Sequence, residues 1–318
     1  MTTPASRTSS TPTLALKIDI DTDHGCRHGL PNVLRILKKH NLQASFFLSL
    51  GPDNMGRAIW RVFYEPGFLK TVRRRGGAST YGWSILFKGF LWPGPILWKK
   101  HQDIFRAIAA DGHEIGVHAW DHHQWQQNAP RLTPDRVRQI WSRMADAFQT
   151  IYNRAPDCAA APGWRASAAM FTLADEFNLC YMSDTRGDAP FLPRLNGQTF
   201  TTPQLPTTMS TLDELVGSGV LANEPRSALT ESLLKELRPD KFNCYTLHAE
   251  MEGLQYQDLF DDFLTGVRAR GYQIDTLGAA AARLTSASLP PADVTDINLL
   301  GRTAPVAWAG SDTKVSGP

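Results

Sequence analysis

Residues 14–21 read Leu-Ala-Leu-Lys-Ile-Asp-Ile-Asp, an apolar run that ends in two acidic side chains. The pattern is typical of a β-strand, in which side chains at positions i and i+2 point the same way. Asp19 and Asp21 should therefore project together, and they repel each other unless a cation neutralises one or one takes up a proton. The stretch predicts a strand with two carboxylates at its end, and a solvated acidic turn through residues 22–24 is the alternative.

The rest of the chain alternates short apolar runs with amphipathic stretches. This alternation predicts mostly parallel strands wound with helices, in an open sheet or a barrel. Several helices open with Ser, Thr-Pro or Asp and close with Gly or Asn. Further strands are expected at 44–50, 114–118, 158–161, 180–183, weakly at 199–205, 243–248 and 272–274, and helices at 30–41, 102–111, 134–151, 168–178, 227–237 and 256–270.

Polar residues follow several of these runs at the point where each run stops. Besides the two aspartates, they are His118, Asp184 and His248. In β/α barrels the catalytic groups gather at this end of the strands, so the placement favours a barrel. Loops also begin there, and any one of these positions taken alone fits an ordinary loop.

Two histidines four residues apart, His118 and His122, form the second feature with chemical potential. On one helical turn or in a tight loop, both imidazoles can bind one metal ion. Together with a carboxylate they would accept zinc, cobalt or manganese. A partly exposed loop of polar and aromatic residues, with Trp120 in its middle, is the simpler alternative.

The remaining candidates are three single positions. His248 ends an apolar strand close to Glu250, a carboxylate able to raise its pKa, which suits a general acid as well as a hydrogen-bonded structural histidine. Arg165 and Asp184 are candidates for an outer layer around the site, in which the guanidinium group orients the catalytic carboxylate. An ordinary salt bridge explains the two residues equally well.

Composition limits the function classes. The 318 residues are 42% hydrophobic and 20% charged, enough for one large core, and the net charge of +2 does not favour nucleic acid as a partner. Four cysteines without a CxxC pair indicate a reducing compartment. The N-terminus lacks the apolar region of a secretory signal, and no run of about 18 to 20 apolar residues predicts a membrane span. We expect one domain at 14–286 between disordered tails at 1–13 and 287–318.

Taken together, Asp19-x-Asp21, His118-xxx-His122, Ala-Pro-Gly-Trp-Arg165 and Leu247-His248 resemble the NodB-homology polysaccharide deacetylase family, over residues 14–284. The resemblance implies a distorted, incomplete (β/α) barrel. It implies one divalent metal ion held by Asp21, His118 and His122, with Asp19 as base and His248 as acid. Trp120, Arg165, Asp184 and Glu250 would surround this centre or contact substrate. Many members place an arginine before the proline of the third motif, whereas here Arg165 follows it.

Further motifs, among them 116–123, 183–187 and 246–250, look like those of members that remove a formyl group from 4-formamido-L-arabinose carried on undecaprenyl phosphate. Such enzymes are cytoplasmic and serve the lipid A modification that gives polymyxin resistance. The resemblance implies a polyprenyl-phosphate-linked formamido sugar as the substrate. A deacetylase of N-acetylated oligosaccharide and an inactive, membrane-associated metal-binding scaffold are the competing hypotheses.

A lipid-linked substrate must be met at a bilayer, here the inner leaflet of the cytoplasmic membrane. An aromatic and basic insertion at about 73–100 has the composition of a segment that enters the membrane interface and attracts anionic lipid. Alternatively, its aromatic side chains fold into the core and its basic ones are merely solvated. The candidates for membrane or lipid-phosphate contact are Arg73, Arg74, Arg75, Trp83, Trp92, Trp98, Lys99 and Lys100.

Overall fold

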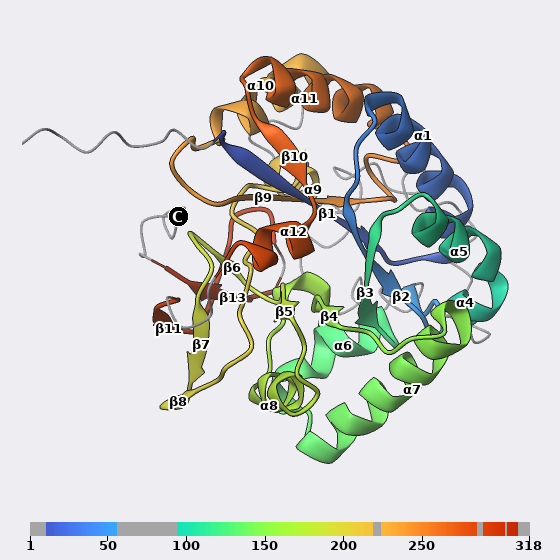
Figure 1. Cartoon of the computed structure of the whole chain (residues 1–318), viewed down its shortest axis with the longest axis vertical. Helices are drawn as coiled ribbons and strands as arrows, with labels where there is room; N and C mark the ends of the chain where they lie inside the picture. The colour runs from blue at the N-terminus through green and yellow to red at the C-terminus, as the bar shows by residue number, and fades with distance from the viewer. Residues whose placement is uncertain (1–10, 56–93, 219–223, 285–288, 303, 311–318) are drawn as a thin grey trace, which may run out of the picture.

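A parallel sheet forms the centre of the molecule in the computed structural model, which describes residues 11–55, 94–218, 224–284, 289–302 and 304–310. Strand β1 (Thr13–Ile20) lies between β9 (Asn243–His248) on one side and two strands on the other. There β10 (Gln273–Asp275) pairs with its first half and β2 (Ser45–Ser49) with its second. The sheet continues through β3 (Glu114–Ala119), β4 (Cys158–Ala159) and β5 (Tyr181–Met182) (Figure 1).

Helices surround this sheet, from α10, α11 and α1 at the top of Figure 1 to α7 and α8 at the bottom. Each of the longer helices buries one apolar face; α1, for example, buries Leu30, Val33, Ile36 and Leu37, which share one side of a 3.6-residue period. The helices are α1 (Leu30–His40), α4 (Leu97–Lys100), α5 (Gln102–Ala110), α6 (His122–Asn128), α7 (Pro134–Tyr152), α8 (Ala168–Glu176), α9 (Leu212–Gly217), α10 (Arg226–Lys235), α11 (Gln257–Ala269) and α12 (Leu277–Ala282).

Strand β1 is buried on both faces, as expected for a strand in a covered parallel sheet. Leu14, Leu16, Ile18 and Ile20 pack into the main core, whereas Ala15 belongs to a smaller core on the other face. Lys17 lies on that second face and is completely buried. Because every strand of this sheet runs in the same direction, the carboxyl ends of β1, β3 and β9 meet at one edge.

The architecture expected from the sequence is confirmed: the strands are parallel, helices alternate with them, and the curved sheet forms a half-barrel. The weak strand expected at 199–205 is much shorter, because only β8 (Gln198–Thr199) forms there, beside β7 (Leu192–Leu195). Helices α4, α6, α9 and α12 were not expected from the sequence.

The segment expected to be a disordered C-terminal tail is folded where the structure describes it. It forms β11 (Pro291–Asp293), β12 (Thr295–Ile297) and β13 (Val306–Ala309). Strand β11 pairs with β7, and β13 pairs with β6 (Arg186–Gly187). The expected disorder was wrong. The Pro, Gly and Ser content of the tail favoured disorder, but residues 306–309, Val-Ala-Trp-Ala, form an apolar strand whose four side chains are buried.

Two smaller points concern membranes and cysteines. Within the described residues, none of the helices combines the length and the apolar character that crossing a bilayer would require. All four cysteines are free thiols, and three of them, Cys26, Cys158 and Cys244, are buried.

Candidate active site

Asp21, His118 and His122 converge at the common edge of β1 and β3. His118 Nε2 lies 3.3 Å from Asp21 Oδ1, and His122 Nε2 lies 3.2 Å from Asp21 Oδ2. One candidate ligand atom from each of the three residues falls within 4.8 Å of the others, and all three are shielded from solvent. Burial alone would raise the pKa of Asp21, but the two imidazoles hold that pKa well below its ordinary value.

The two histidines are fixed by different elements. His118 is the penultimate residue of β3, and its Nδ1 donates to Ala160 O at 2.8 Å, which leaves Nε2 as the lone-pair nitrogen. His122 is the first residue of α6, whose N-cap Asp121 accepts a hydrogen bond from Gln124 N. Of the two geometries expected from the sequence, one helical turn is wrong, because His118 lies in a strand; the tight loop fits, since only Trp120 and Asp121 separate the end of β3 from the start of α6.

Glu250 fixes the backbone that carries Asp21. Its Oε1 accepts hydrogen bonds from Asp21 N at 3.2 Å, from Thr22 N at 2.9 Å and from Thr22 Oγ1 at 2.7 Å. A Cβ on Gly25 would lie 1.9 Å from the same oxygen, so this close approach requires glycine. Burial and the charge of Asp21 raise the pKa of Glu250 to about 7.

Asp19 and His248 are direct neighbours in the sheet, because the register of β1 and β9 pairs them. Asp19 Oδ2 lies 4.0 Å from His118 Nε2, which places this carboxylate beside the cluster without making it a fourth member. Its other oxygen, Oδ1, is buried and has no hydrogen-bond partner in the described part of the chain. A buried, unpaired carboxylate oxygen next to a histidine is suited to proton transfer.

Lys17, rather than Arg165, is the cation beside Asp19. Its Nζ lies 3.7 Å from Asp19 Oδ2 and donates to Ser183 O at 3.0 Å. Burial raises the pKa of Asp184 to about 7, although Lys17 acts in the opposite direction. Arg165 instead donates to Pro305 O at 2.9 Å and lies 3.7 Å from Asp296, so it anchors the C-terminal segment.

The carboxylate nearest to the His248 ring is Asp213, not Glu250 as the sequence suggested. His248 Nδ1 lies 3.8 Å from Asp213 Oδ1, at the start of α9. Burial lowers the pKa of His248, but Asp213 and the other nearby carboxylates raise it above its ordinary value on balance. Glu252 accepts from His248 N at 3.1 Å and from the Tyr245 hydroxyl at 2.6 Å, which fixes the end of β9.

Arg302, in the C-terminal segment, holds Asp213 in turn. Its Nη1 lies 3.3 Å from Asp213 Oδ2, and its Nε donates to Glu214 Oε1 at 2.9 Å. Arg186 Nη2 lies 3.2 Å from the other oxygen of Glu214. Both guanidinium groups lie over the buried ring of Trp164, at 4.3 Å for Arg302 and 4.9 Å for Arg186. Sequence reasoning missed Lys17, Asp213 and Arg302.

Most of the expected membrane segment, including Arg73, Arg74, Arg75, Trp83 and Trp92, lies outside the described residues. Of its described members, Lys100 Nζ lies 2.7 Å from Asp23 Oδ1, which also accepts from His101 Nε2 at 2.7 Å. Trp98 packs against the main core, and Lys99 Nζ lies over its ring at 5.5 Å. Trp120 lies between the two histidines in the chain and has Arg143 6.0 Å from its ring.

The donor set fits a divalent ion. Two imidazole nitrogens and one carboxylate form a common set of protein ligands for catalytic zinc and related ions. Asp21 Oδ1 is buried, lies 3.3 Å from His118 Nε2 and has no hydrogen-bond partner in the described part of the chain, and a bound cation would satisfy it. Asp21, His118 and His122 would hold the ion, which leaves Asp19 and His248 available for proton transfer.

A family model for polysaccharide deacetylases matches residues 7–182. Among curated proteins, the chain is 41% identical over 251 residues to a probable 4-deoxy-4-formamido-L-arabinose-phosphoundecaprenol deformylase from Shewanella sediminis, covering 79% of this chain and 80% of that protein. A protein of the same description from Wigglesworthia glossinidia brevipalpis is 35% identical over 241 residues, covering 76% of this chain and 82% of that protein.

Solved structures support the fold. A putative polysaccharide deacetylase from Mycobacterium smegmatis superposes with a TM-score of 0.62 at 18% identity, over 94% of this chain and 98% of that one. A peptidoglycan N-acetylglucosamine deacetylase, Bc1960, gives a TM-score of 0.53 at 18% identity, over 85% of this chain and 88% of that one. At these identities the likeness establishes a shared architecture and nothing finer.

Proposed function

The chain belongs to the polysaccharide deacetylase family, and from that premise we propose that it is a metal-dependent deformylase. It hydrolyses the formamide of 4-deoxy-4-formamido-L-arabinose linked to undecaprenyl phosphate, the reaction for which its curated relatives are named. The products are formate and a lipid-linked 4-amino sugar, as lipid A modification with aminoarabinose and polymyxin resistance require. The observation that carries the proposal is the convergence of Asp21, His118 and His122 beside the paired Asp19 and His248.

Each catalytic role is assigned to an atom that the contacts described above leave available. When bound at the three ligands, a divalent ion supplies a Lewis acid that polarises the formyl oxygen and lowers the pKa of water. Asp19 Oδ1, which is buried and unpaired, accepts a proton from the attacking water. His248 turns Nδ1 towards Asp213, so its Nε2 remains to protonate the amine as the carbon–nitrogen bond breaks.

Proton balance fits the groups present. Formation of the carbon–oxygen bond releases one proton from water, and departure of the amine consumes one. Asp19 must therefore begin ionised and His248 protonated. Asp213 raises the pKa of His248 and so favours its protonated form, and Lys17 Nζ lies 3.7 Å from Asp19 Oδ2. Neither role requires a residue outside the described part of the chain.

The lipid-linked substrate places the enzyme at a membrane surface, and we propose peripheral binding to the inner leaflet of the cytoplasmic membrane. The aromatic and basic composition of residues 73–100 supports this proposal. Vesicle flotation tests it with a variant in which Trp92 and Trp98 are both changed to Ser. Flotation at the wild-type level in that variant would exclude these tryptophans as the anchor.

The experiment that tests the proposed function measures two products from two substrates. Metal-loaded protein is incubated with the lipid-linked formamido sugar and with an N-acetylated chitooligosaccharide, with and without chelator. We expect chelator-sensitive release of formate from the first substrate and no acetate from the second. Acetate alone would make the chain a deacetylase, and the absence of both products would leave a metal-binding scaffold.

A further inference from the structure

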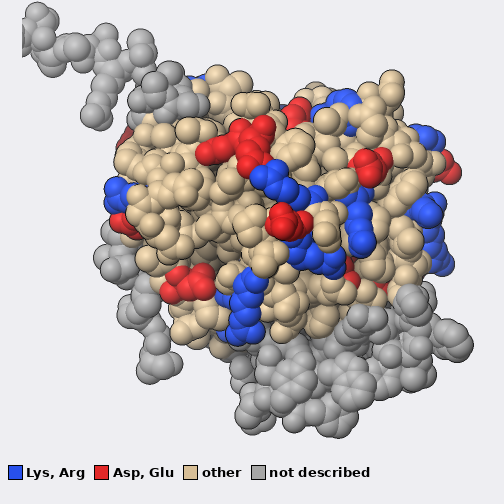
Figure 2. Space-filling view, turned by 90° about the horizontal axis from the view of Figure 1, so that it is seen from below, with Lys and Arg blue, Asp and Glu red and all other residues tan. Residues whose placement is uncertain are grey.

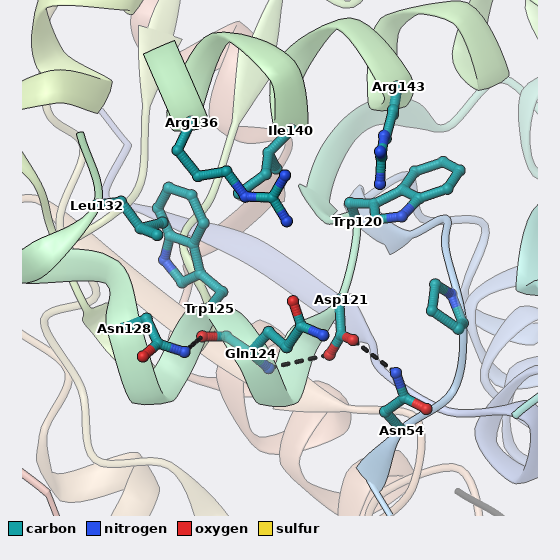
Figure 3. Close-up of a pocket in the computed structure, with 11 residues that line it drawn as sticks. Asn54, Trp120, Asp121, Gln124, Trp125, Asn128, Leu132, Arg136, Ile140 and Arg143 are labelled. Atoms are coloured by element: carbon teal, nitrogen blue, oxygen red, sulfur yellow. Dashed lines mark hydrogen bonds between the residues drawn. The ribbon is translucent and has the colours of Figure 1, made fainter. Parts of the chain in front are cut away.

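A pocket of about 220 Å³ lies between α6 and α7, bordered by the residues that separate the two histidine ligands (Figure 3). Trp120 and Asp121 line it from this connection, Gln124 and Trp125 from α6, and Arg136 and Arg143 from α7. Asp121 directly precedes His122 in the chain, so the pocket borders the connection that carries this proposed metal ligand. The proposed reaction does not assign any role to it.

The pocket carries two arginines without acidic partners. Arg136 and Arg143 are seven residues apart on α7 and therefore share one face, from which both point into the pocket (Figure 3). Within the described residues, neither guanidinium group has a carboxylate within 4.0 Å; the guanidinium group of Arg136 donates to the neutral Gln139 Oε1 at 3.1 Å. Arg138, which lies between them in sequence, instead pairs with Glu176 at 2.5 Å. Arg138 does not line the pocket, so among the arginines of α7 only the two that line it lack a carboxylate partner in the described part of the chain.

One acidic side chain also lines the pocket, but its oxygens are engaged. Asp121 Oδ1 accepts from Gln124 N at 2.9 Å, and Oδ2 accepts from Asn54 Nδ2 at 2.6 Å. Both bonds belong to the N-cap of α6 and to its link with the loop after β2. Two guanidinium groups and one carboxylate leave a surplus of one positive charge, which favours a monoanion.

The volume of the pocket and the side chains that line it limit which anions it can bind. The volume lies below the roughly 300 to 1,000 Å³ of typical small-molecule sites, so the pocket suits a head group rather than a polyprenyl chain. Trp125 is fixed because its Nε1 donates to Arg165 O at 3.1 Å, and Trp120 offers a second aromatic ring. Basic side chains also gather near the middle of the face seen from below, with acidic ones beside them (Figure 2).

We infer that this pocket binds the phosphodiester that joins the sugar to the lipid in the substrate, an inference that rests on the proposed function. A phosphodiester carries a single negative charge, which matches the surplus of the pocket, and the planar guanidinium group matches phosphate geometry with paired donors. Arg136 and Arg143 then hold the lipid-linked end of the substrate while its formamide lies at the metal site. The pocket makes the enzyme selective for sugars that carry phosphate.

The test compares two substrates that differ only in the phosphate. One is the 4-formamido-arabinose linked to a short polyprenyl phosphate, and the other is the methyl glycoside of the same sugar. For the Arg136→Gln and Arg143→Gln variants, we expect KM for the first substrate to rise by about tenfold or more, with kcat unchanged and the methyl glycoside unaffected. Arg138→Gln, on the same helix, is the matched control and should change neither substrate. Equal effects on both substrates, or none on either, would overturn the inference.

A binding measurement separates this inference from the proposed function. If wild-type protein releases formate from neither substrate, the deformylase assignment fails, and the pocket is then tested by calorimetric titration with the methyl phosphodiester of geraniol. Binding that is lost in the Arg136→Gln/Arg143→Gln double variant and kept in Arg138→Gln supports the pocket. Binding that survives the double substitution, or inorganic phosphate binding as tightly as the diester, contradicts it.

Discussion

The side of the active site that carries the proposed metal ligands, the metal side, and the side that carries the proposed acid His248, the acid side, are assembled in different ways. On the metal side, Asp21 follows β1 and His118 ends β3, two parallel strands separated by β2, while His122 begins α6; the orientation of His118 depends on a main-chain group, Ala160 O. On the acid side, His248 comes from a strand end as well, but it depends on Asp213 at the start of α9 and on Arg302 in the C-terminal segment. Strand topology brings the first set together, whereas ion pairs between distant segments assemble the second.

This difference predicts a gradient of mutational effects. Loss of a metal ligand removes a group that nothing else replaces. Loss of a charge partner on the acid side leaves the reacting groups present and changes only their orientation or their protonation.

The largest effects are expected for two carboxylates, Asp19 near the end of β1 and Asp21 directly after it. Asp21→Asn and Asp19→Asn should each lower kcat by about 10²- to 10⁴-fold, the range of a lost acid–base or metal-activating group. Only Asp21→Asn should also lose the bound metal, because Asp19 lies outside the ligand set. Metal content and formate release measured on both variants check this, and Asp19→Asn with normal turnover would exclude Asp19 as the base.

Asp213→Asn is expected to lower kcat by about 10- to 100-fold, the effect of removing the partner that supports a reacting group, here a carboxylate 3.8 Å from the imidazole. Asp213 raises the pKa of His248, and His248 must be protonated to act as an acid. Activity therefore falls as pH rises through this pKa, and removing Asp213 should move that fall to lower pH. The profiles of kcat against pH for the variant and wild type measure the shift; superimposable profiles would show that Asp213 does not tune the acid.

Arg302→Gln should lower kcat by about tenfold, because it acts on His248 only through Asp213. It also removes a charged partner from each of two buried carboxylates, Asp213 and Glu214, which we expect to cost about 3 kcal/mol of unfolding free energy. Arg302→Lys should restore part of the activity. Arg283→Gln, which breaks an exposed pair with Asp275, is the control and should leave both quantities almost unchanged.

The smallest effect on turnover is expected for Arg165→Gln. This arginine holds Pro305 O and not the catalytic carboxylate, so its loss should weaken the C-terminal segment by about 1 kcal/mol and leave kcat within about twofold. Lys17→Gln is the matched comparison, since Lys17 lies beside Asp19 and its loss should lower kcat about tenfold. A larger loss of kcat in Arg165→Gln than in Lys17→Gln would contradict the assignment of Lys17, rather than Arg165, as the cation that supports Asp19.

The same contrast explains what the sequence could and could not predict. The strand ending in Asp19 and Asp21, the histidine pair and His248 were predictable because strand periodicity and parallel topology place them at one edge. Asp213 and Arg302 were not, because their meeting with His248 depends on long loops whose path no local pattern specifies. Glu250 was expected near the imidazole from its place in the sequence, but its backbone turns it towards Asp21 and Thr22 instead.

Lys17 was the one missed residue with a visible signal. It interrupts an otherwise apolar run and shares the strand face of Asp19, so a buried lysine beside the catalytic carboxylate follows from the period of two. The folded C-terminal segment had a comparable signal in Val-Ala-Trp-Ala, which composition averaged over the whole tail concealed.

The most direct test of the central claim is metal titration of turnover. Protein stripped by chelator receives increasing amounts of Co²⁺, Mn²⁺ or Zn²⁺, and formate release from the lipid-linked formamido sugar is measured at each step. We predict that activity returns in proportion to added metal and saturates at one equivalent per chain for wild type, and that Asp21→Asn does not recover at that amount. Full activity in the metal-free protein, or equal recovery in Asp21→Asn, would contradict a metal centre built from Asp21, His118 and His122.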